Sequence, residues 1–131
     1  MNKESISGLI LAGGRGTRMG HVDKGLQPFA GTTMVAHVLA RLEPQVATVA
    51  INANRNLDTY AACGVPVWPD DTPDYAGPLA GLQVGLRRCA TTYLLTAPCD
   101  SPFLPEDLAE RLLDGLRAAG ADLAEIGRAH V

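Results

Sequence analysis

Apolar residues along the chain form short, nearly continuous runs that alternate with longer amphipathic stretches. Continuous rather than alternating apolar runs are typical of strands that are buried on both faces of a parallel sheet. The pattern predicts four such strands, at Ile6–Ala12, Ala47–Ala53, Val65–Trp68 and Tyr93–Ala97.

The stretches between these runs predict helices at Thr32–Leu42, Leu57–Cys63, Leu79–Cys89 and Pro105–Ala119. The first carries Met34, Val38 and Leu42 on one face, and the third carries an equivalent stripe of Leu79, Leu82 and Leu86. Regular alternation of strand and helix predicts the α/β class, a doubly wound, Rossmann-like and mostly parallel sheet with helices on both faces.

Polar and glycine-rich segments follow each predicted strand. In open parallel sheets ligands bind beyond the carboxyl ends of the strands, so we expect these segments to converge on one edge. They are Gly13–Gly25, Asn52–Arg55, Asp70–Gly77 and Pro98–Pro102. This edge is the predicted active site.

Composition restricts the function classes. The chain has 131 residues and a net charge of -3, which predicts one globular domain and argues against nucleic acid as a partner. No apolar run is long enough to span a membrane and no signal peptide is evident, so we expect no membrane association. The three cysteines form no C-x-x-C pair, which is typical of a reduced, cytoplasmic protein.

The loop LAGGRGTRMGHVDKG, residues 11–25, combines five glycines with Arg15, Arg18 and Lys24. Backbone amides of such a loop can surround a phosphate, and the cations add charge. The loop lacks the Gly-Lys pair of a Walker sequence and, at Met19, the third small residue of the dinucleotide fingerprint. The alternative is a glycine turn with solvated basic residues.

Acidic and amide side chains follow the other strands. One or two carboxylates with phosphate oxygens and water suit Mg²⁺, which makes Asp100 and Asp70 candidates, with Asp71 as the solvent-facing member of its pair. Asn52 and Asn54 are candidates for contacting a base or ribose. Each of these residues is also a common turn former or helix cap, so that alternative stays open.

Other reactive groups have no catalytic context. His21, His37 and His130 lack the spacing of a zinc site, and no base is evident for Cys99. Without a nucleophile–base pair, the chemistry favoured is direct displacement at phosphorus, where positioning and charge neutralisation supply the catalysis.

LAGGRGTRMGHVDKG followed by LQPFAG resembles the signature of nucleotidyltransferases that activate sugars and cofactors with an NTP. Within that superfamily, INANR, DDTPDYAGPLAGL and APCDSPFLPEDL are similar to the molybdenum cofactor guanylyltransferases, the MobA family. The motifs occur in order from about Gly8 to Leu108, over most of the chain.

The resemblance implies Mg²⁺-dependent transfer of GMP from GTP to molybdopterin-type cofactor, with release of pyrophosphate. It implies that Leu11, Ala12, Gly13, Asn52 and Asp70 contact GTP. It also implies that Lys24 and Arg18 act on the phosphates and that Asp100 binds both Mg²⁺ and nucleotide. Cofactor synthesis and insertion proteins are further candidate partners.

Members of this family continue beyond the length of this chain. We therefore expect residues 1–124 to form the N-terminal part of the nucleotidyltransferase domain, stable only marginally, with an unpaired sheet edge and reduced or no activity. The last seven residues, EIGRAHV, correspond to a translation of GAG ATC GGA AGA GCA CAC GTC, a common sequencing adapter, so we expect 125–131 to be a non-native tail. Other codons in the nucleotide sequence would contradict this.

Three alternative functions are also compatible with the sequence. A related enzyme could use CTP or act on a sugar phosphate. A catalytically silent module would bind the nucleotide without turning it over. A structural α/β domain would not respond to nucleotide.

Overall fold

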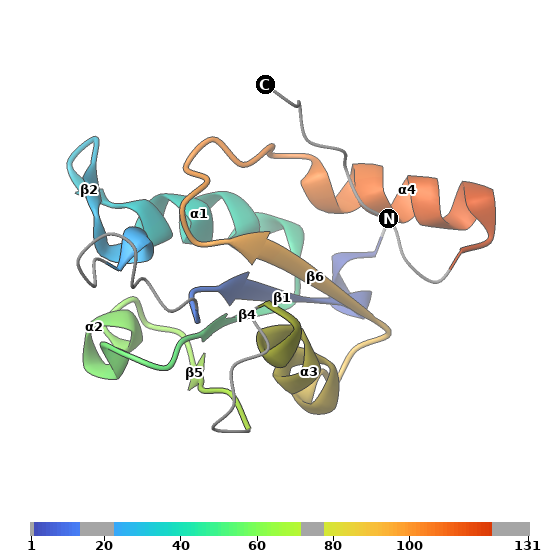
Figure 1. The fold of residues 1–131 in the computed structure, drawn as a ribbon. Helices are drawn as coiled ribbons and strands as arrows, with labels where there is room; N and C mark the ends of the chain where they lie inside the picture. Colours follow the sequence, from blue (N-terminus) through green and yellow to red (C-terminus); the bar gives the residue numbers. More distant parts are fainter. Residues whose placement is uncertain (1, 14–22, 72–77, 122–131) are drawn as a thin grey trace.

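The computed structural model describes residues 2–13, 23–71 and 78–121 (Figure 1). Its centre is a parallel four-stranded sheet in the order β5-β4-β1-β6. The strands are β1 (Ile6–Leu11), β4 (Thr48–Asn52), β5 (Val67–Trp68) and β6 (Tyr93–Pro98). Each lies within its predicted range except for Pro98, one residue beyond, so the prediction of a parallel α/β sheet is confirmed.

The direction in which successive strands are added to the sheet reverses at β1. The chain passes from β1 to β4 and β5 on one side, and then crosses to β6 on the other side of β1. Such a reversal opens a crevice at the carboxyl ends of the two strands on either side of it. Among the described strands β6 pairs only with β1, which makes it an edge strand.

Helices cover both faces of the sheet, as predicted. Helix α1 (Met34–Leu42) and helix α4 (Leu108–Ala119) lie on one side, whereas α3 (Pro78–Arg88) lies on the other (Figure 1). The short helix α2 (Leu57–Ala61) follows β4. Short 3-10 turns lie at η1 (Lys3–Ser5), η3 (Lys24–Leu26) and η4 (Glu43–Gln45).

The main core lies between the sheet and the α1/α4 layer. Helix α1 contributes four buried residues, which are Val35, Val38, Leu39 and Leu42. They pack in one cluster with buried residues of α4 and with Ile6, Ile10 and Ile51 of the sheet. The stripe predicted for α1 is therefore buried, although Met34 at its start is only half-buried.

The stripe predicted for α3 is wrong. Leu79 and Leu86 are 66% and 61% exposed, whereas the residues that face the sheet are Ala80, Gly81, Val84 and Gly85. A Cβ on Gly85 would lie 2.6 Å from Leu9 Cδ2 and 2.9 Å from Leu94 Cδ2. Because α3 approaches the sheet this closely at Gly85, no side chain fits at that position.

The first predicted helix also begins later than expected, because Thr32–Thr33 forms strand β3. It pairs with β2 (Pro28–Phe29) in an antiparallel hairpin whose turn, Ala30 and Gly31, has φ values of 47° and 92°. Two central residues with positive φ are typical of a tight hairpin turn. Thr33 then caps α1, since its hydroxyl accepts a hydrogen bond from the Ala36 amide at 3.3 Å.

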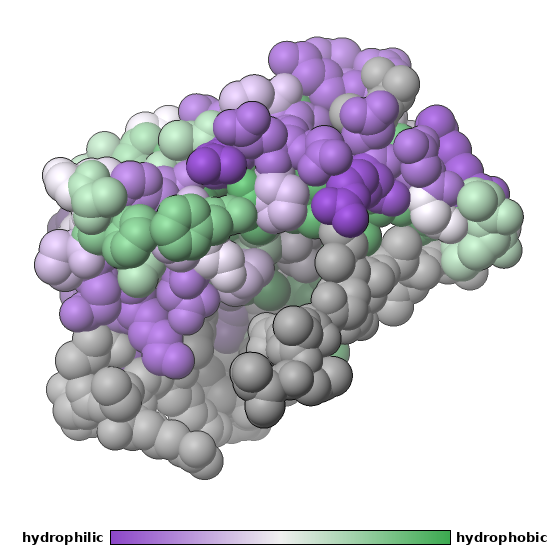
Figure 2. Space-filling model, turned by 90° about the horizontal axis from the view of Figure 1, so that it is seen from above, coloured by the Kyte–Doolittle hydropathy of each residue, from purple (hydrophilic) through white to green (hydrophobic). Residues whose placement is uncertain are grey.

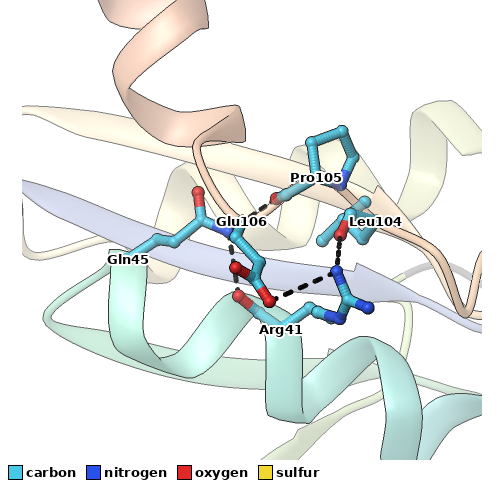
Figure 3. Close-up of polar contacts among 5 residues, drawn as sticks. All are labelled: Arg41, Gln45, Leu104, Pro105 and Glu106. Carbon is cyan, nitrogen blue, oxygen red and sulfur yellow. Dashed lines mark hydrogen bonds and ion pairs between the residues drawn. The ribbon is translucent and has the colours of Figure 1, made fainter.

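Helix α4 begins at Leu108 rather than at the predicted Pro105. The preceding loop is held by side chains instead: Arg41 donates to the Leu104 carbonyl at 3.3 Å, and Gln45 donates to the Pro105 carbonyl at 2.9 Å (Figure 3). The side-chain oxygen of the buried Gln45 accepts from the Ala109 amide at 2.8 Å. Gln45 thus supplies the capping group of α4 from outside that helix.

The outer surface of the α1/α4 layer is mostly hydrophilic, with an apolar area on the side of the hairpin (Figure 2). Phe103, 74% exposed, stacks edge-on against Phe29 with 5.5 Å between the ring centroids. His37 packs edge-on against the same Phe29 ring, and its Nε2 lies 2.6 Å from the Phe29 carbonyl oxygen. The prediction that His37 is structural agrees with these contacts.

Candidate nucleotide-binding site

The segments that follow the strands meet at the carboxyl end of the sheet. The Cys99 amide donates to the Leu11 carbonyl at 3.2 Å, and the Ala12 amide donates to the Asn52 carbonyl at 2.7 Å. The backbone at Leu11–Gly13 therefore lies between the ends of β4 and β6. The carboxyl ends of β4, β1 and β6 meet there, and the predicted convergence is confirmed for the described segments.

Two asparagine amides hold the carboxylate of Asp70. Asn52 Nδ2 donates to Asp70 Oδ1 at 2.9 Å, and Asn54 Nδ2 donates to Asp70 Oδ2 at 3.0 Å. The Asp70 amide returns a hydrogen bond to Asn54 Oδ1 at 2.8 Å. Asn52 is buried and also donates to the Trp68 carbonyl at 2.9 Å. Both asparagines therefore serve the local structure, and they also fix the orientation of a carboxylate.

Two glycines border this cluster. A Cβ on Gly13 would lie 2.7 Å from Asn52 Oδ1 and 3.0 Å from Asn54 Nδ2. A Cβ on Gly81, in the first turns of α3, would also collide with Asn52 Oδ1 and would lie 2.9 Å from Leu11 Cδ2. The absence of side chains at these two positions lets the first loop and α3 approach the asparagines closely.

Asp71 has a different environment from Asp70. Its Oδ2 forms an ion pair with Arg87 Nη1 at 2.5 Å, at the last turn of α3. Next to this pair, the Arg88 guanidinium lies 5.5 Å from the centroid of the Trp68 ring. These contacts attach the end of β5 to α3 and direct Asp71 away from the Asp70 cluster, in agreement with the prediction for this pair.

Lys24 and Asp100 lie on two segments that contact each other. A Cβ on Gly25, the residue after Lys24, would lie 3.1 Å from Cys99 Cβ, the residue before Asp100. Lys24 and Asp100 are both exposed. Within the described residues neither side chain has a hydrogen-bond or ion-pair partner. A cation and an anion are thus both available to a ligand at this edge.

The sequence did not indicate Asp23 as a functional residue. Its carboxylate accepts hydrogen bonds from the hydroxyl of Tyr60 and from Asn56 Nδ2, the latter at 3.2 Å. Tyr60 is fully buried. The only signal in the sequence was a tyrosine within an amphipathic stretch, since a buried tyrosine hydroxyl usually finds a partner.

Burial keeps the Cys99 thiol and the Tyr60 hydroxyl in their neutral, protonated forms. Burial raises the pKa of the Cys99 thiol to about 12, with smaller contributions from the charges of Asp100 and Asp23. Burial also raises the pKa of Tyr60, helped by its hydrogen bond to Asp23. Cys99 is therefore not an activated nucleophile, as expected from the sequence, and Tyr60 acts as a hydrogen-bond donor.

Part of the predicted site falls outside the described residues. Arg15, Arg18 and His21 belong to residues 14–22, and the suspected tail belongs to 122–131. Across the ranges that the structure does describe, no three histidine, cysteine or acidic side chains gather as they would around a metal ion. In the same ranges no helix has the length and apolar character required to cross a membrane.

A parallel α/β sheet with a glycine-bordered polar cluster at the carboxyl ends of β4 and β5 has the architecture of the α/β domains that bind ligands at this edge. The model of the MobA-like NTP transferase domain matches residues 8–129, and the chain belongs to this family.

Several similar proteins carry the name molybdenum cofactor guanylyltransferase. The chain is 61% identical over 122 residues to the molybdenum cofactor guanylyltransferase of Cupriavidus necator, and 65% identical over 119 residues to that of Ralstonia nicotianae. These matches cover 93% and 91% of this chain, but 61% and 58% of the respective relatives. The chain thus spans about three fifths of the length of these proteins.

Solved structures show the same fold at low sequence identity. Rv0371c from Mycobacterium tuberculosis, in complex with manganese, matches with a TM-score of 0.65 at 21% identity, over 90% of this chain and 62% of that one. 4-Diphosphocytidyl-2C-methyl-D-erythritol synthase matches with a TM-score of 0.64 at 19% identity, over 91% of this chain and 57% of that one. Both matches confirm the architecture.

Proposed function

We propose that this chain provides the nucleotide-binding part of a molybdenum cofactor guanylyltransferase. The reaction is transfer of GMP from GTP to the terminal phosphate of a molybdopterin-type cofactor, with release of pyrophosphate. The relatives at about 60% identity carry this name. The observation that supports it most directly is the Asp70 carboxylate, fixed by Asn52 and Asn54 beside the backbone of Gly13.

The Asp70 cluster supplies a reason for GTP rather than CTP. Guanine presents two adjacent donors on its pairing edge, the ring N1–H and the exocyclic amine, whereas cytosine presents one amine beside two acceptors. The side-chain amides of Asn52 and Asn54 each donate one hydrogen bond to Asp70, and these bonds fix the orientation of its carboxylate, which can accept further hydrogen bonds. An acceptor in a fixed orientation favours the base with two donors, because a mismatched polar edge leaves buried groups unpaired.

The phosphates would lie toward Lys24, with Arg18 and the backbone of Leu11–Gly13 as further contacts. A single exposed carboxylate, Asp100, suits Mg²⁺, which retains most of its water and takes its other ligands from phosphate oxygens. Mg²⁺ bound there would neutralise charge on the triphosphate. The manganese complex of Rv0371c, which shares this fold, is consistent with a divalent cation.

The chain's own groups bind and orient rather than transfer protons. The attacking group is a phosphate oxygen that is already anionic, so the displacement at the α-phosphorus requires no strong general base. The neutral thiol of Cys99 and the neutral hydroxyl of Tyr60 fit this scheme. Lys24 balances charge as the pyrophosphate leaves, and in-line alignment supplies most of the remaining catalysis.

Binding of GTP to this chain, measured by calorimetry with and without Mg²⁺, tests the proposal. We expect Lys24→Ala to weaken GTP binding at least about tenfold and Asp100→Ala to remove the effect of Mg²⁺. Lys3→Ala and Asp114→Ala are matched controls, because both residues are exposed and lie outside the site. Wild-type affinity in both test variants would show that the site is wrong.

The same measurements separate the alternatives. Tighter binding of CTP would favour a related transferase, and no response to any nucleotide would favour a structural domain. Pyrophosphate release with a molybdopterin-type acceptor, in a chain extended to the length of the relatives, separates an enzyme from a silent binding module. In that chain Asp100→Ala should abolish turnover.

The remaining expectations concern location and partners. We propose a cytoplasmic protein, supported by three cysteines that are all free. Contacts with cofactor synthesis and insertion proteins follow from the proposed reaction. Co-purification of the extended chain with such proteins would test them.

A further inference from the structure

Asp23 immediately precedes Lys24 and occupies the N-cap position of the turn η3. An aspartate at this position commonly accepts a hydrogen bond from the backbone of its own turn. The carboxylate of Asp23 makes no such bond, and η3 is closed by backbone bonds such as Leu26 N–H to the Asp23 carbonyl at 3.1 Å. The side chain of Asp23 therefore serves another purpose.

The two donors to the Asp23 carboxylate among the described residues belong to α2 or to its cap. Tyr60 lies within α2 and is fully buried, and Asn56 is the N-cap of α2 with φ 53°. The left-handed region is rare for residues other than glycine, although asparagine tolerates it. From this position the Asn56 amide reaches Asp23 Oδ2 at 3.2 Å. Two donors thus hold two carboxylate oxygens, one each.

The same tyrosine touches the segment that carries Lys24. A Cβ on Gly25 would lie 2.6 Å from the Tyr60 hydroxyl oxygen and 3.2 Å from Cys99 Sγ. Gly25 is buried between them. The turn that presents Lys24 is consequently confined between α2 and the residue that precedes Asp100.

We propose that Asp23, held by Tyr60 and Asn56, is a positioning residue that sets the distance and direction of Lys24 relative to Asp100. This inference rests on the proposed function, in which these two charges bind the triphosphate. A carboxylate near a polyanion is unfavourable by charge alone. Its presence is explained by geometry, because two donors require a group with two acceptor oxygens, and asparagine offers only one.

Tyr60→Phe and Asp23→Asn test the proposal in this chain. Each change removes one hydrogen bond to the Asp23 side chain, and we expect GTP binding with Mg²⁺ to weaken about fivefold to twentyfold. Tyr93→Phe is the control for the lost hydroxyl, and Asp58→Asn is the control for the lost charge, since Asp58 is exposed in α2. Both controls should bind GTP like the parent chain.

A double-mutant cycle separates positioning from general stability. If Tyr60 acts through Lys24, Tyr60→Phe should weaken GTP binding in the parent chain but add no further loss in a Lys24→Ala background. An equal loss in both backgrounds would overturn the proposal. Urea unfolding without nucleotide confirms that each variant is folded at the temperature of the binding measurement.

If Tyr60→Phe does not fold, Asn56→Ala provides the same test, because Asn56 is exposed and donates only one bond to Asp23. Unchanged GTP affinity in Asn56→Ala and Asp23→Asn would overturn the positioning role. The proposed function would fail separately, through a Lys24→Ala variant that binds GTP normally.

Discussion

Helices α1 and α3 cover opposite faces of one sheet and pack on it in opposite ways. Helix α1 buries Val35, Val38, Leu39 and Leu42 in the main core. Helix α3 instead turns Gly81 and Gly85 toward the strands and exposes Leu79 and Leu86. The difference shows that a row of leucines marks a buried helix face only where the two layers leave room for large side chains.

The close approach of α3 to the sheet also has a consequence for the proposed site. Gly81 brings the first turns of α3 against Asn52, and Asn52 holds Asp70 in the proposed base site. In the α1 layer the positioning is done by long side chains, because Arg41 and Gln45 donate hydrogen bonds to the loop that follows Asp100 (Figure 3). One face positions the site by close backbone approach, and the other positions it by hydrogen bonds to a loop.

The largest effect on stability is expected from Leu42→Ala in α1. Leu42 is fully buried, and its Cδ2 would lie 3.1 Å from a Cβ placed on Gly8. We expect the free energy of unfolding to fall by about 3 kcal/mol, because the cavity left behind is only partly refilled. Urea unfolding with an unchanged m-value measures this loss. A loss below about 1 kcal/mol would contradict the tight packing described for α1.

Gly81→Ala should have the next largest effect. The new Cβ collides with the buried Asn52 side chain, which two hydrogen bonds hold in place. We expect the free energy of unfolding to fall by about 2 kcal/mol, as for other overpacked cores. GTP affinity should fall as well, because Asn52 cannot move without releasing Asp70.

Gly115→Ala is the matched control, since Gly115 lies inside α4 and a Cβ there meets nothing within 4 Å. This variant should be more stable than the parent, by up to about 1 kcal/mol, because alanine loses less backbone entropy in a helix. If Gly81→Ala were also stabilising, the close approach of α3 to the sheet would be disproved.

Strand pattern and chain topology made most of this arrangement predictable. Continuous apolar runs located the four strands, and the parallel order then brought Leu11–Gly13, Asn52, Asp70 and Asp100 to one edge. The hairpin at 28–33 escaped prediction because its strands have two residues each, too few for a periodic signal. The buried face of α3 escaped because glycine contributes nothing to a hydrophobic stripe.

The other features that the sequence did not predict are contacts between residues far apart along the chain. Asp23 and Tyr60 are separated by 37 positions, and nothing in either local sequence indicates that they meet. The side-chain cap of α4 by Gln45 joins positions 64 apart in the same way. Patterns along the chain predict which elements form, whereas such pairings depend on how close the elements come.

The smallest effect is expected from Leu86→Ala, which repeats the Leu42→Ala change on the other helix. Leu86 is 61% exposed, so truncation leaves no cavity, and alanine is at least as good a helix former as leucine. We expect the free energy of unfolding to change by less than about 0.5 kcal/mol and GTP affinity to stay the same. A loss as large as that of Leu42→Ala would mean that α3 buries its leucines, and the contrast between the two helices would then be wrong. Unchanged stability would instead agree with a helix that packs on the sheet through Ala80, Gly81, Val84 and Gly85 and leaves Leu86 in solvent.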